Sequence, residues 1–247
     1  MSHEFHILIP ARLASTRLPK KALLEIDGQP LVVHTLRRAE DCGAASVHVA
    51  TDSDEIATVV RSAGGQVVMT SGDHLSGTDR LAEAVARLEF DDSNIVVNLQ
   101  GDEPGMPTAC VRQVARLLRN DLGARMATLH ESILDEKQWR DPNVVKVVAD
   151  NDGRALYFSR APIPHPRDGQ WPNQLAFRHV GMYAYRVSAL LAWRKLAPSP
   201  LEQTESLEQL RALQAGWVIA VAGAVESIPV GIDTPGDLER LRGQNLK

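Results

Sequence analysis

One short segment near the start of the chain combines the residue types that hold phosphate groups. It carries two hydroxyl residues and four cations but no acid, in the order Arg12, Ser15, Thr16, Arg17, Lys20 and Lys21. The formal net charge of the whole chain is −4, so this positive charge is a local concentration. Such side chains, assisted by backbone N–H groups of the loop, suit phosphate oxygens. A solvated surface loop is the alternative interpretation.

Two common phosphate-binding patterns are missing from the sequence. The chain has neither Gly-x-x-x-x-Gly-Lys-Ser/Thr nor Gly-x-Gly-x-x-Gly, the patterns of an ATPase P-loop and of a dinucleotide site. An NAD-linked dehydrogenase therefore has little support. Gly-x-Ser-x-Gly is also missing, so hydrolysis by a serine nucleophile is not indicated. A phosphate site in this chain would depend mainly on side chains.

Asp102 is the first candidate metal ligand. It follows an apolar run at residues 95–99 and is reached through Gly101. An acid at the carboxyl end of a parallel strand faces the ligand cleft of an open α/β sheet. Mg²⁺ prefers one or two carboxylates together with substrate phosphates. A turn acid or a helix cap explains Asp102 equally well from spacing alone.

Asp233 is the second candidate ligand. It precedes Thr234 and Pro235, which together predict a helix N-cap followed by proline at the first helical position. Asp233 lies just outside that helix and is free to point elsewhere. Only the fold could bring Asp233 next to Asp102, and the spacing gives no evidence for it.

Further polar residues are scattered along the chain. Residues 73–80 form a polar loop with a capping residue before a helix, and taken alone this structural role is favoured. Arg160, His179, Tyr183 and residues 202–211 follow no catalytic spacing. Lone histidines and arginines in such settings are usually structural.

Strand and helix patterns alternate in the first half of the chain. This alternation predicts where in the fold the candidate site residues lie. Strands are predicted at residues 5–10, 47–50, 67–69 and 95–99, and helices at about 31–39, 56–63, 81–88 and 108–119. This alternation predicts parallel βαβ units with right-handed crossovers. Both the basic segment and Asp102 then follow strands at the same edge of the sheet.

The pattern changes after about residue 125. Apolar runs at residues 144–148 and 155–158 flank Asn151-Asp152-Gly153, which predicts a β-hairpin. A Pro-rich loop follows at 162–172, with helices at about 187–195, 200–215 and 234–243. We predict one α/β domain over residues 1–247, with a doubly wound, mainly parallel central sheet. A β-rich insertion at about residues 125–190 would cover the substrate or form a dimer.

Composition narrows the class of protein. The 247 residues are 44% hydrophobic and 23% charged, which is ordinary for a globular domain. The longest charge-free apolar stretch, residues 215–225, is too short to span a membrane. The acidic balance argues against nucleic-acid binding. Cys42 and Cys110 form no Cys-x-x-Cys pattern, so we expect no zinc or redox site and a cytoplasmic protein.

An ordered set of segments resembles the sugar-acid cytidylyltransferases. The first is Ile9-Pro10-Ala11-Arg12 with Ser15-Thr16-Arg17-Leu18-Pro19, and the resemblance continues to Asp233-Thr234-Pro235 and covers essentially the whole chain. Between them lie similar segments at residues 50–52, 74–83, 97–104, 143–148, 155–160, 178–183, 199–202 and 207–211. One such motif is weak, but the ordered set is specific.

The resemblance implies a Rossmann-like nucleotidyltransferase fold and a Mg²⁺-dependent reaction. CMP would pass from CTP to the anomeric hydroxyl of 3-deoxy-D-manno-octulosonate (Kdo), releasing pyrophosphate, in lipopolysaccharide biosynthesis. The family is also expected to form homodimers.

By motif, CTP would contact Arg12, Ser15, Arg17, Lys21, Ser76, Thr78 and Arg80. The sugar acid would contact Gln100, Arg160, His179, Tyr183, Glu208 and Gln209. Asp102 and Asp233 would bind Mg²⁺, and the catalytic residues would be Arg12, Arg17, Lys21 and Asp102.

Departures from the family pattern leave alternatives open. Lys20 stands where the family usually has glycine, so either Lys20 or Lys21 could hold phosphate. Another sugar acid, such as a sialic acid or an amino-Kdo, would leave the phosphate side unchanged. A catalytically silent nucleotide-binding protein on the same fold is an alternative of a different class, against which both aspartates and the full basic segment argue.

Overall fold

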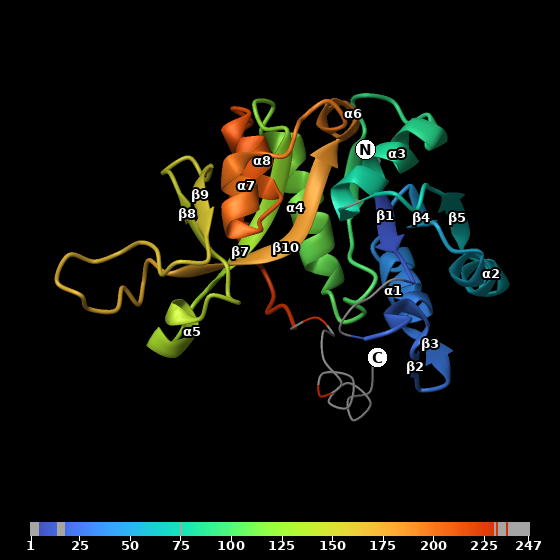
Figure 1. Ribbon diagram of the computed structural model, residues 1–247, viewed down its shortest axis with the longest axis horizontal. Coiled ribbons are helices and arrows are strands. Elements are labelled where there is room, and N and C mark those ends of the chain that lie inside the picture. The colour runs from blue at the N-terminus through green and yellow to red at the C-terminus, as the bar shows by residue number, and fades with distance from the viewer. Residues whose placement is uncertain (1–4, 14–17, 75, 230, 232–235, 237–247) are drawn as a thin grey trace.

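The computed structural model describes residues 5–13, 18–74, 76–229, 231 and 236. Its main element is a nine-stranded sheet (Figure 1). The strands of this sheet are β1 (Phe5–Ala11), β4 (Ser46–Thr51), β5 (Gln66–Met69), β6 (Ile95–Asn98), β7 (Met126–Ser132), β8 (Lys146–Ala149), β9 (Ala155–Ser159), β10 (Phe177–Arg186) and β11 (Ile219–Gly223). A separate two-stranded sheet joins β2 (Glu25–Ile26) and β3 (Gln29–Pro30).

Eight α-helices are described. They are α1 (Leu31–Glu40), α2 (Asp54–Ser62), α3 (Gly77–Leu88), α4 (Thr108–Asn120), α5 (Glu136–Arg140), α6 (Val187–Trp193), α7 (Pro200–Glu205) and α8 (Gln209–Gln214), with a 3₁₀ turn, η1, at Lys21–Leu23. None of these described helices is long and apolar enough to cross a membrane.

The strand order of the sheet is β11-β7-β10-β6-β1-β4-β5. Pairing is parallel from β6 through β1 and β4 to β5, and again between β11 and β7. The exception is β10, which lies antiparallel between β6 and β7. The predicted α/β fold with a mainly parallel central sheet is therefore confirmed.

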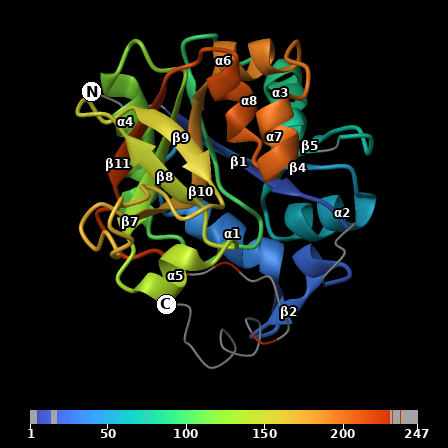
Figure 2. The same cartoon turned by 60° about the vertical axis from the view of Figure 1, so that its left-hand side comes forward.

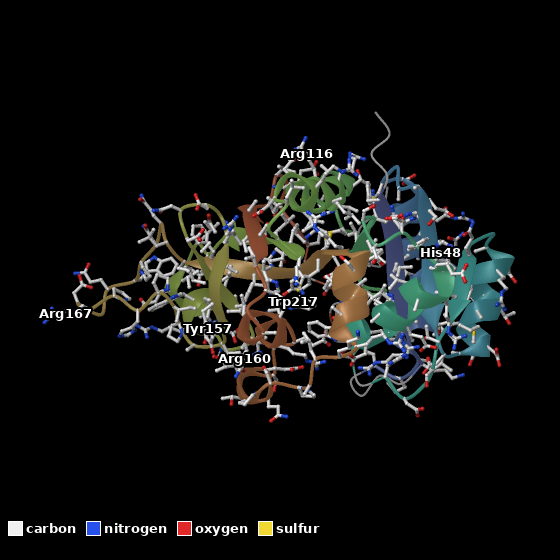
Figure 3. All side chains as sticks on the ribbon, turned by 90° about the horizontal axis from the view of Figure 1, so that it is seen from above. His48, Arg116, Tyr157, Arg160, Arg167 and Trp217 are labelled. Atoms are coloured by element: carbon white, nitrogen blue, oxygen red, sulfur yellow. The ribbon has the colours of Figure 1, made fainter. Side chains whose placement is uncertain are left out.

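Helices cover both faces of the sheet because successive side chains of a strand point to opposite faces. Ile7 and Ile9 of β1 pack in one buried cluster with α1, α2 and α4. Leu8 packs in a second cluster with α3, α6 and α8. Seen from above, α4 lies on one side of the sheet and α6 and α8 on the other (Figure 3). This two-faced burial is the doubly wound arrangement that the alternating patterns predicted.

The second half of the chain extends the sheet and also projects from it. Within the predicted insertion, β7 and β10 lie in the main strand order. The strands β8 and β9 are attached to the sheet through β10 and project from the body with α5 (Figures 1 and 2). The predicted hairpin is confirmed, since β8 and β9 pair antiparallel. The Pro-rich loop ends farthest from the body, with Arg167 at its tip (Figure 3). We call α5, β8, β9 and this loop the arm.

Two predicted elements differ from the structure or fall outside it. The single helix expected at 200–215 is two helices, α7 and α8, because Ser206 adopts a left-handed conformation with φ of 52°. Ser199 and Glu202 form a capping box that starts α7. The helix predicted at 234–243 lies outside the described residues.

Candidate active site

The carboxyl ends of β1 and β6 lie side by side and begin the site. Their parallel pairing sets Leu8 opposite Asn98, and the Leu99 amide donates to the Leu8 carbonyl at 3.1 Å. The residues that follow both strands therefore emerge at the same edge of the sheet. A Cβ on Gly101 would lie 3.1 Å from the Pro10 carbonyl oxygen, so glycine permits this close approach.

Lys21 and Asp102 meet at this edge. Lys21 Nζ lies 2.5 Å from Asp102 Oδ2, and the side chains are 13% and 33% exposed. Lys20 has different surroundings, because its ammonium group binds the Glu55 carboxylate at 2.8 and 3.0 Å and is 60% exposed. Of the two lysines, Lys21 is therefore the one directed at the acid after β6.

Glu103 is a buried carboxyl beside Asp102. Burial raises its pKa to about 8, and the neighbouring Asp102 charge adds to the effect. Its Oε2 atom has no hydrogen-bond partner within the part of the chain that the structure describes. The α4 helix begins only at Thr108, so Asp102 is a turn residue with an ion pair and does not cap that helix.

A cavity of about 130 Å³ opens beside the end of β1. Its lining residues are Pro10, Ala11, Arg12, His74, Ser76, Gly77, Arg80 and Gln100. Arg12 is exposed, whereas Arg80 is 3% exposed and is held by Thr70 at 2.5 Å and Asp52 at 3.3 Å. The cavity thus has one exposed guanidinium and one that is buried and held by two partners.

Local hydrogen bonds fix the rim of this cavity. Ser76 caps α3 by accepting from the Asp79 amide at 3.1 Å, as the sequence predicted. His74 lies 2.5 Å from the Glu83 carboxylate. Burial alone would raise the Glu83 pKa, but hydrogen bonds from the Ser71 amide, His74 and Arg87 outweigh it and lower the pKa to about 2. The residues from 71 to 83 are thereby held together.

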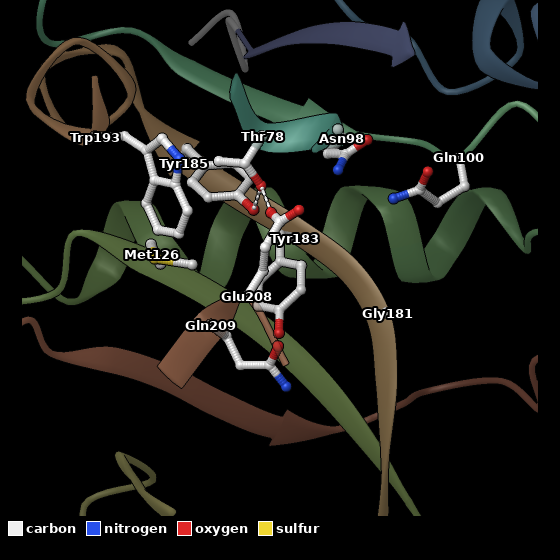
Figure 4. A pocket seen from close by; sticks show the side chains of 11 residues that line it. Thr78, Asn98, Gln100, Met126, Gly181, Tyr183, Tyr185, Trp193, Glu208 and Gln209 are labelled. Carbon is white, nitrogen blue, oxygen red and sulfur yellow. Dashed lines mark hydrogen bonds between the residues drawn. The ribbon is translucent and has the colours of Figure 1, made fainter. Parts of the chain in front are cut away.

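A second cavity, of about 200 Å³, adjoins the first. The two share Gly77 and Gln100. The remaining lining residues come from α3, the central strands, α6 and α8 (Figure 4): Thr78, Asn98, Met126, Gly181, Tyr183, Tyr185, Trp193, Glu208 and Gln209. We call these two spaces the small and the large cavity.

Buried polar atoms in the large cavity lack partners. Asn98 Oδ1, the Tyr183 hydroxyl and Gln209 Nε2 are buried without a hydrogen bond from any described residue. Buried polar groups in native proteins are nearly always satisfied, and exceptions need an explanation. Three of them around one cavity indicate that a polar ligand completes the hydrogen bonds.

Glu208 gives the large cavity an unusual carboxyl group. Burial raises its pKa, although the Thr78 hydroxyl donates to it and lowers the pKa in part. Thr78 also lies 3.4 Å from the Tyr185 hydroxyl, and Figure 4 shows both contacts as dashed lines. The lining residues of this cavity include Glu208 but no Lys or Arg.

Two residues assigned by motif to the sugar acid lie outside both cavities. His179 is half-buried beside Tyr183, with ring centroids 5.3 Å apart, and its pKa falls to about 3 through desolvation and the nearby Arg178 charge. Arg160 donates to the backbone carbonyls of Glu205 and Pro142, at 2.7 and 3.0 Å.

Apart from His179 and Arg160, the predicted site residues fall into three groups. The cavities bring together Arg12, Ser76, Thr78, Arg80, Gln100, Tyr183, Glu208 and Gln209. Lys21 and Asp102 form the ion pair at the adjacent edge. Ser15, Arg17 and Asp233 lie outside the described residues. Sequence reasoning gave no role to Asn98, although it lies in the similar segment at residues 97–104, or to Tyr185, which lies just beyond the segment at residues 178–183.

Comparison with known proteins identifies the family. The model of the cytidylyltransferase family matches residues 6–227. The chain belongs to the cytidylyltransferase family. The resemblance carried by the motifs is thereby confirmed, and the matched region includes every residue of both cavities.

Two solved structures resemble this cytidylyltransferase. The structure of CMP:2-keto-3-deoxy-manno-octonic acid synthetase complexed with CTP is 42% identical, with a TM-score of 0.90 and coverage of 97% of each chain. A cytidylyltransferase from Leptospira borgpetersenii serovar Hardjo-bovis (strain JB197) is 19% identical, with a TM-score of 0.61, and the match covers 97% of this chain and 85% of that one. The second likeness concerns the fold alone.

Proposed function

We propose that this cytidylyltransferase transfers CMP from CTP to the anomeric hydroxyl of Kdo, giving CMP-Kdo and pyrophosphate for lipopolysaccharide biosynthesis. The observation that carries the proposal is the pair of cavities that share Gly77 and Gln100, together with the Lys21–Asp102 ion pair. The 42% identity to a synthetase of this name, solved with CTP, supports the choice of both substrates.

CTP would occupy the small cavity and the edge beside it. Arg12, Ser76 and Arg80 line that cavity and would contact the nucleotide. Thr78, assigned to CTP by motif, lines the large cavity instead. Lys21, with Ser15 and Arg17 by motif, would bind the triphosphate. Arg80 is held in place before substrate binds, which lowers the entropy cost of an ordered contact.

The sugar acid would occupy the large cavity. Gln100, Tyr183, Glu208 and Gln209 line it, and the unpartnered Tyr183 and Gln209 atoms suit a polyhydroxylated ligand. Gln100 belongs to both cavities, so the two substrates would meet beside it. His179 supports the Tyr183 ring, and Arg160 would reach the sugar acid only after leaving its carbonyl partners.

Mg²⁺ would bind between Asp102 and Asp233. Asp102 supplies an accessible carboxylate at the phosphate end of the site, and this donor fits a cation that also binds triphosphate oxygens. Gly231 supports the pairing, because a Cβ on it would lie 3.7 Å from the Asp102 carbonyl oxygen. Asp233 follows two residues later, within about 7 Å of chain reach. When bound, Mg²⁺ would neutralise charge on the triphosphate.

The reaction requires two anions to approach each other. The anomeric oxygen attacks the α-phosphorus and loses its proton, the bond from the α-phosphorus to the bridging oxygen breaks, and pyrophosphate leaves. The enzyme acts mainly by positioning and by stabilising charge. Arg12, Arg17 and Lys21 would offset the repulsion between the sugar carboxylate and the triphosphate.

Pyrophosphate release tests the substrate assignment. We expect release with CTP plus Kdo, and at most slow release with CTP plus N-acetylneuraminate. Turnover with N-acetylneuraminate alone would indicate another sugar-acid cytidylyltransferase. Binding of CTP without turnover on any sugar acid would instead indicate a silent nucleotide-binding protein.

The metal assignment has its own test. Asp102→Asn should lower Mg²⁺-dependent turnover on the order of 30- to 1000-fold, since about 2–4 kcal/mol of transition-state stabilisation is lost. Calorimetry should show that the variant still binds CTP. Asp152→Asn, in the exposed turn between β8 and β9, is the matched control and should retain full activity.

We also propose that the enzyme is a cytoplasmic homodimer. Large apolar side chains are exposed on and beside the arm, with Leu134 at 85%, Leu175 at 64% and Leu156 at 62% exposure. Such a group of exposed side chains is typical of an interface. Cys42 and Cys110 are both buried free thiols, which is compatible with a reducing compartment.

A further inference from the structure

A third cavity lies away from the proposed active site. Its volume is about 450 Å³, within the usual range for small-molecule sites. It is lined by Phe5, Asp41, Cys42, Gly43, Ala109, Arg112, Gln113, Ala115, Arg116, Arg119 and Val225. We call it the α4 groove, because most of its lining comes from that helix.

The α4 groove is at the opposite end of the sheet from the substrate cavities. Phe5 is the first residue of β1, whereas Ala11, the last, lines the small cavity. The seven residues of β1 span about 20 Å. A ligand in the groove therefore could not touch CTP or the sugar acid.

Positive charge gathers on one side of the groove. Arg112, Arg116 and Arg119 follow at four- and three-residue spacing, so they share a face of α4. Figure 3 shows Arg116 at the outer surface of that helix. Asp41 is the one acid among the lining residues.

Two of these arginines also differ from most others in the protein. Arg112 and Arg116 form no hydrogen bond or ion pair with another described residue, although Arg112 is close enough to Cys42 to influence its thiol. Elsewhere Arg154 binds Asp121 and Arg211 binds Glu202. Like charges at helical neighbour positions repel by about 0.2–0.5 kcal/mol, and an anion would relieve that repulsion.

Apart from Asp41 and Gln113, the rest of the groove lining is apolar. Ala109, Ala115 and Phe5 contribute hydrocarbon, and the Val225 side chain is 58% exposed at the rim. Burial raises the pKa of the Cys42 thiol to about 11, despite the nearby Arg112 charge. Cys42 is therefore neutral at physiological pH and adds to the uncharged surface. Arginines beside such a surface suit a ligand with an apolar body and a charged end.

We propose that the α4 groove is a binding site for an amphiphilic organic anion, separate from the active site. Its carboxylate, sulfonate or phosphate group binds between Arg112 and Arg116. Its apolar body, about the size of a fused aromatic pair, lies against Ala109, Ala115 and Val225. Arginine forms strong charge-assisted hydrogen bonds with such groups, and burial of the apolar body adds to the affinity.

The probe for this site is 8-anilinonaphthalene-1-sulfonate, which has an aromatic body and one anionic group. Its fluorescence is titrated with the full chain while CTP and Mg²⁺ are saturating, so that the proposed substrate site is filled. We expect saturable binding of one molecule. The Arg112→Gln/Arg116→Gln variant should bind about tenfold more weakly or worse, and salt should weaken binding to the wild type.

Controls separate this site from other surfaces. Arg61→Gln removes an exposed arginine from α2 and should leave probe affinity unchanged. Methyl spectra should place the probe at Ala109, Ala115 and Val225, and both variants should keep wild-type thermal unfolding. A chain lacking residues 1–4 should bind the probe as the full chain does.

Several results would overturn the proposal. They are equal affinity in the double variant, displacement of the probe by CTP, and methyl shifts away from the groove. Binding that appears only after removal of residues 1–4 would instead assign the groove to the chain's own N-terminal segment. None of these results depends on turnover, so the proposed reaction stands or falls separately.

Discussion

Lys20 and Lys21 are neighbours in the chain but have separate partners. Lys20 is in the left-handed conformation, with φ of 54°, and directs its ammonium group to Glu55 on α2. Lys21 begins the 3₁₀ turn and directs its ammonium group to Asp102. The left-handed conformation of Lys20 thus separates a surface ion pair from the ion pair at the proposed active site. The exposed Lys20–Glu55 ion pair should contribute little to stability, and it lies away from the proposed site. We therefore expect replacement of Lys21, but not of Lys20, to lower activity strongly.

Replacing each lysine by methionine tests this difference. Lys21→Met should lower kcat/KM on the order of 30- to 1000-fold, because a partly buried charge contact with the triphosphate is lost. Lys20→Met keeps the size of the side chain and should change kcat/KM by less than about threefold. Equal losses in the two variants would mean that the segment acts only through its total charge.

Asn98 is the residue of the large cavity whose role the structure adds. It is 2% exposed, and its Oδ1 has no partner among the described residues. We expect Asn98→Ala to raise KM for the sugar acid about tenfold, which corresponds to one lost hydrogen bond to a bound hydroxyl. The calorimetric Kd for CTP should not change. Asn120→Ala, at the exposed end of α4, is the control. A change confined to CTP affinity would assign Asn98 to the nucleotide instead.

Single positions were predictable where local chemistry distinguishes them. Asp102 follows an apolar run through a glycine, and Ser76 precedes a helix, so both have recognisable surroundings in the sequence. Asn98 stands at the end of an apolar strand, and the cavity that it lines is completed by β10 and α8, which lie far along the chain. Arg160 has no local signal either, because its partners belong to Glu205 and Pro142.

At the scale of elements, α3 is fastened to the loop before it through Glu83. The carboxylate accepts from the Ser71 amide at 2.8 Å and from Arg87 at 2.7 Å, and it contacts His74. These contacts fix the rim of the small cavity from the side opposite β1. These hydrogen bonds depend on the negative charge of Glu83. Protonation of its carboxylate at low pH should therefore weaken the attachment of α3 to the loop before it.

The expected effect of pH on Glu83 has a definite sign. Its pKa is about 2 in the folded state, against an ordinary value of 4.5. The carboxylate therefore stabilises the fold above about pH 4.5, and this contribution is lost as the pH falls towards 2. Its full size is up to about 3 kcal/mol. In urea unfolding, Glu83→Gln should have a lower free energy of unfolding than the wild type at pH 6, and the difference should shrink towards pH 3. A deficit independent of pH would show that the side-chain shape matters and its charge does not.

Helices and strands with a regular spacing of apolar residues were predictable from the sequence, and strands without such a regular pattern were not. The four helices and four strands of the first half follow their apolar spacing. No strand was predicted at β7, β10 or β11. In β11 the segment Ile219–Gly223 is rich in small residues, and β10 is ten residues long with a bulge between Val180 and Tyr183. Gly181 and Tyr183, at this irregular part of the strand, both line the large cavity.

The topology of the whole molecule assembles the site from distant segments. Inserting β10 between β6 and β7 brings residues 181–185 beside Asn98, and packing of α8 on the same face adds Glu208 and Gln209. Alternating patterns predicted a parallel sheet but could not reveal an antiparallel strand within it. Long-range pairing is decided by burial over the whole sheet, for which the sequence has no local signal.

The arm and the segments beside it carry the surface at which we propose that the dimer forms. Leu134 and Leu175 lie on neighbouring segments, because the Ile133 amide donates to the Ala176 carbonyl at 2.9 Å. Both side chains are exposed, at 85% and 64%, while Ile133 and Ala176 are buried beneath them with Trp139. Two exposed leucines above this buried cluster are suited to contact with the same surface of a second copy, as an isologous interface requires.

Charge at this pair should separate the subunits. We expect Leu134→Glu/Leu175→Glu to be monomeric by light scattering at a concentration at which the wild type is dimeric, since two buried carboxylates oppose association. Leu122→Glu is the matched control, because Leu122 is 86% exposed but lies at the α4–β7 turn, away from the arm. Far-ultraviolet circular dichroism should be the same for all variants. A wild-type chain that is already monomeric would contradict the dimer. A double variant that remains dimeric would exclude this part of the arm as the interface.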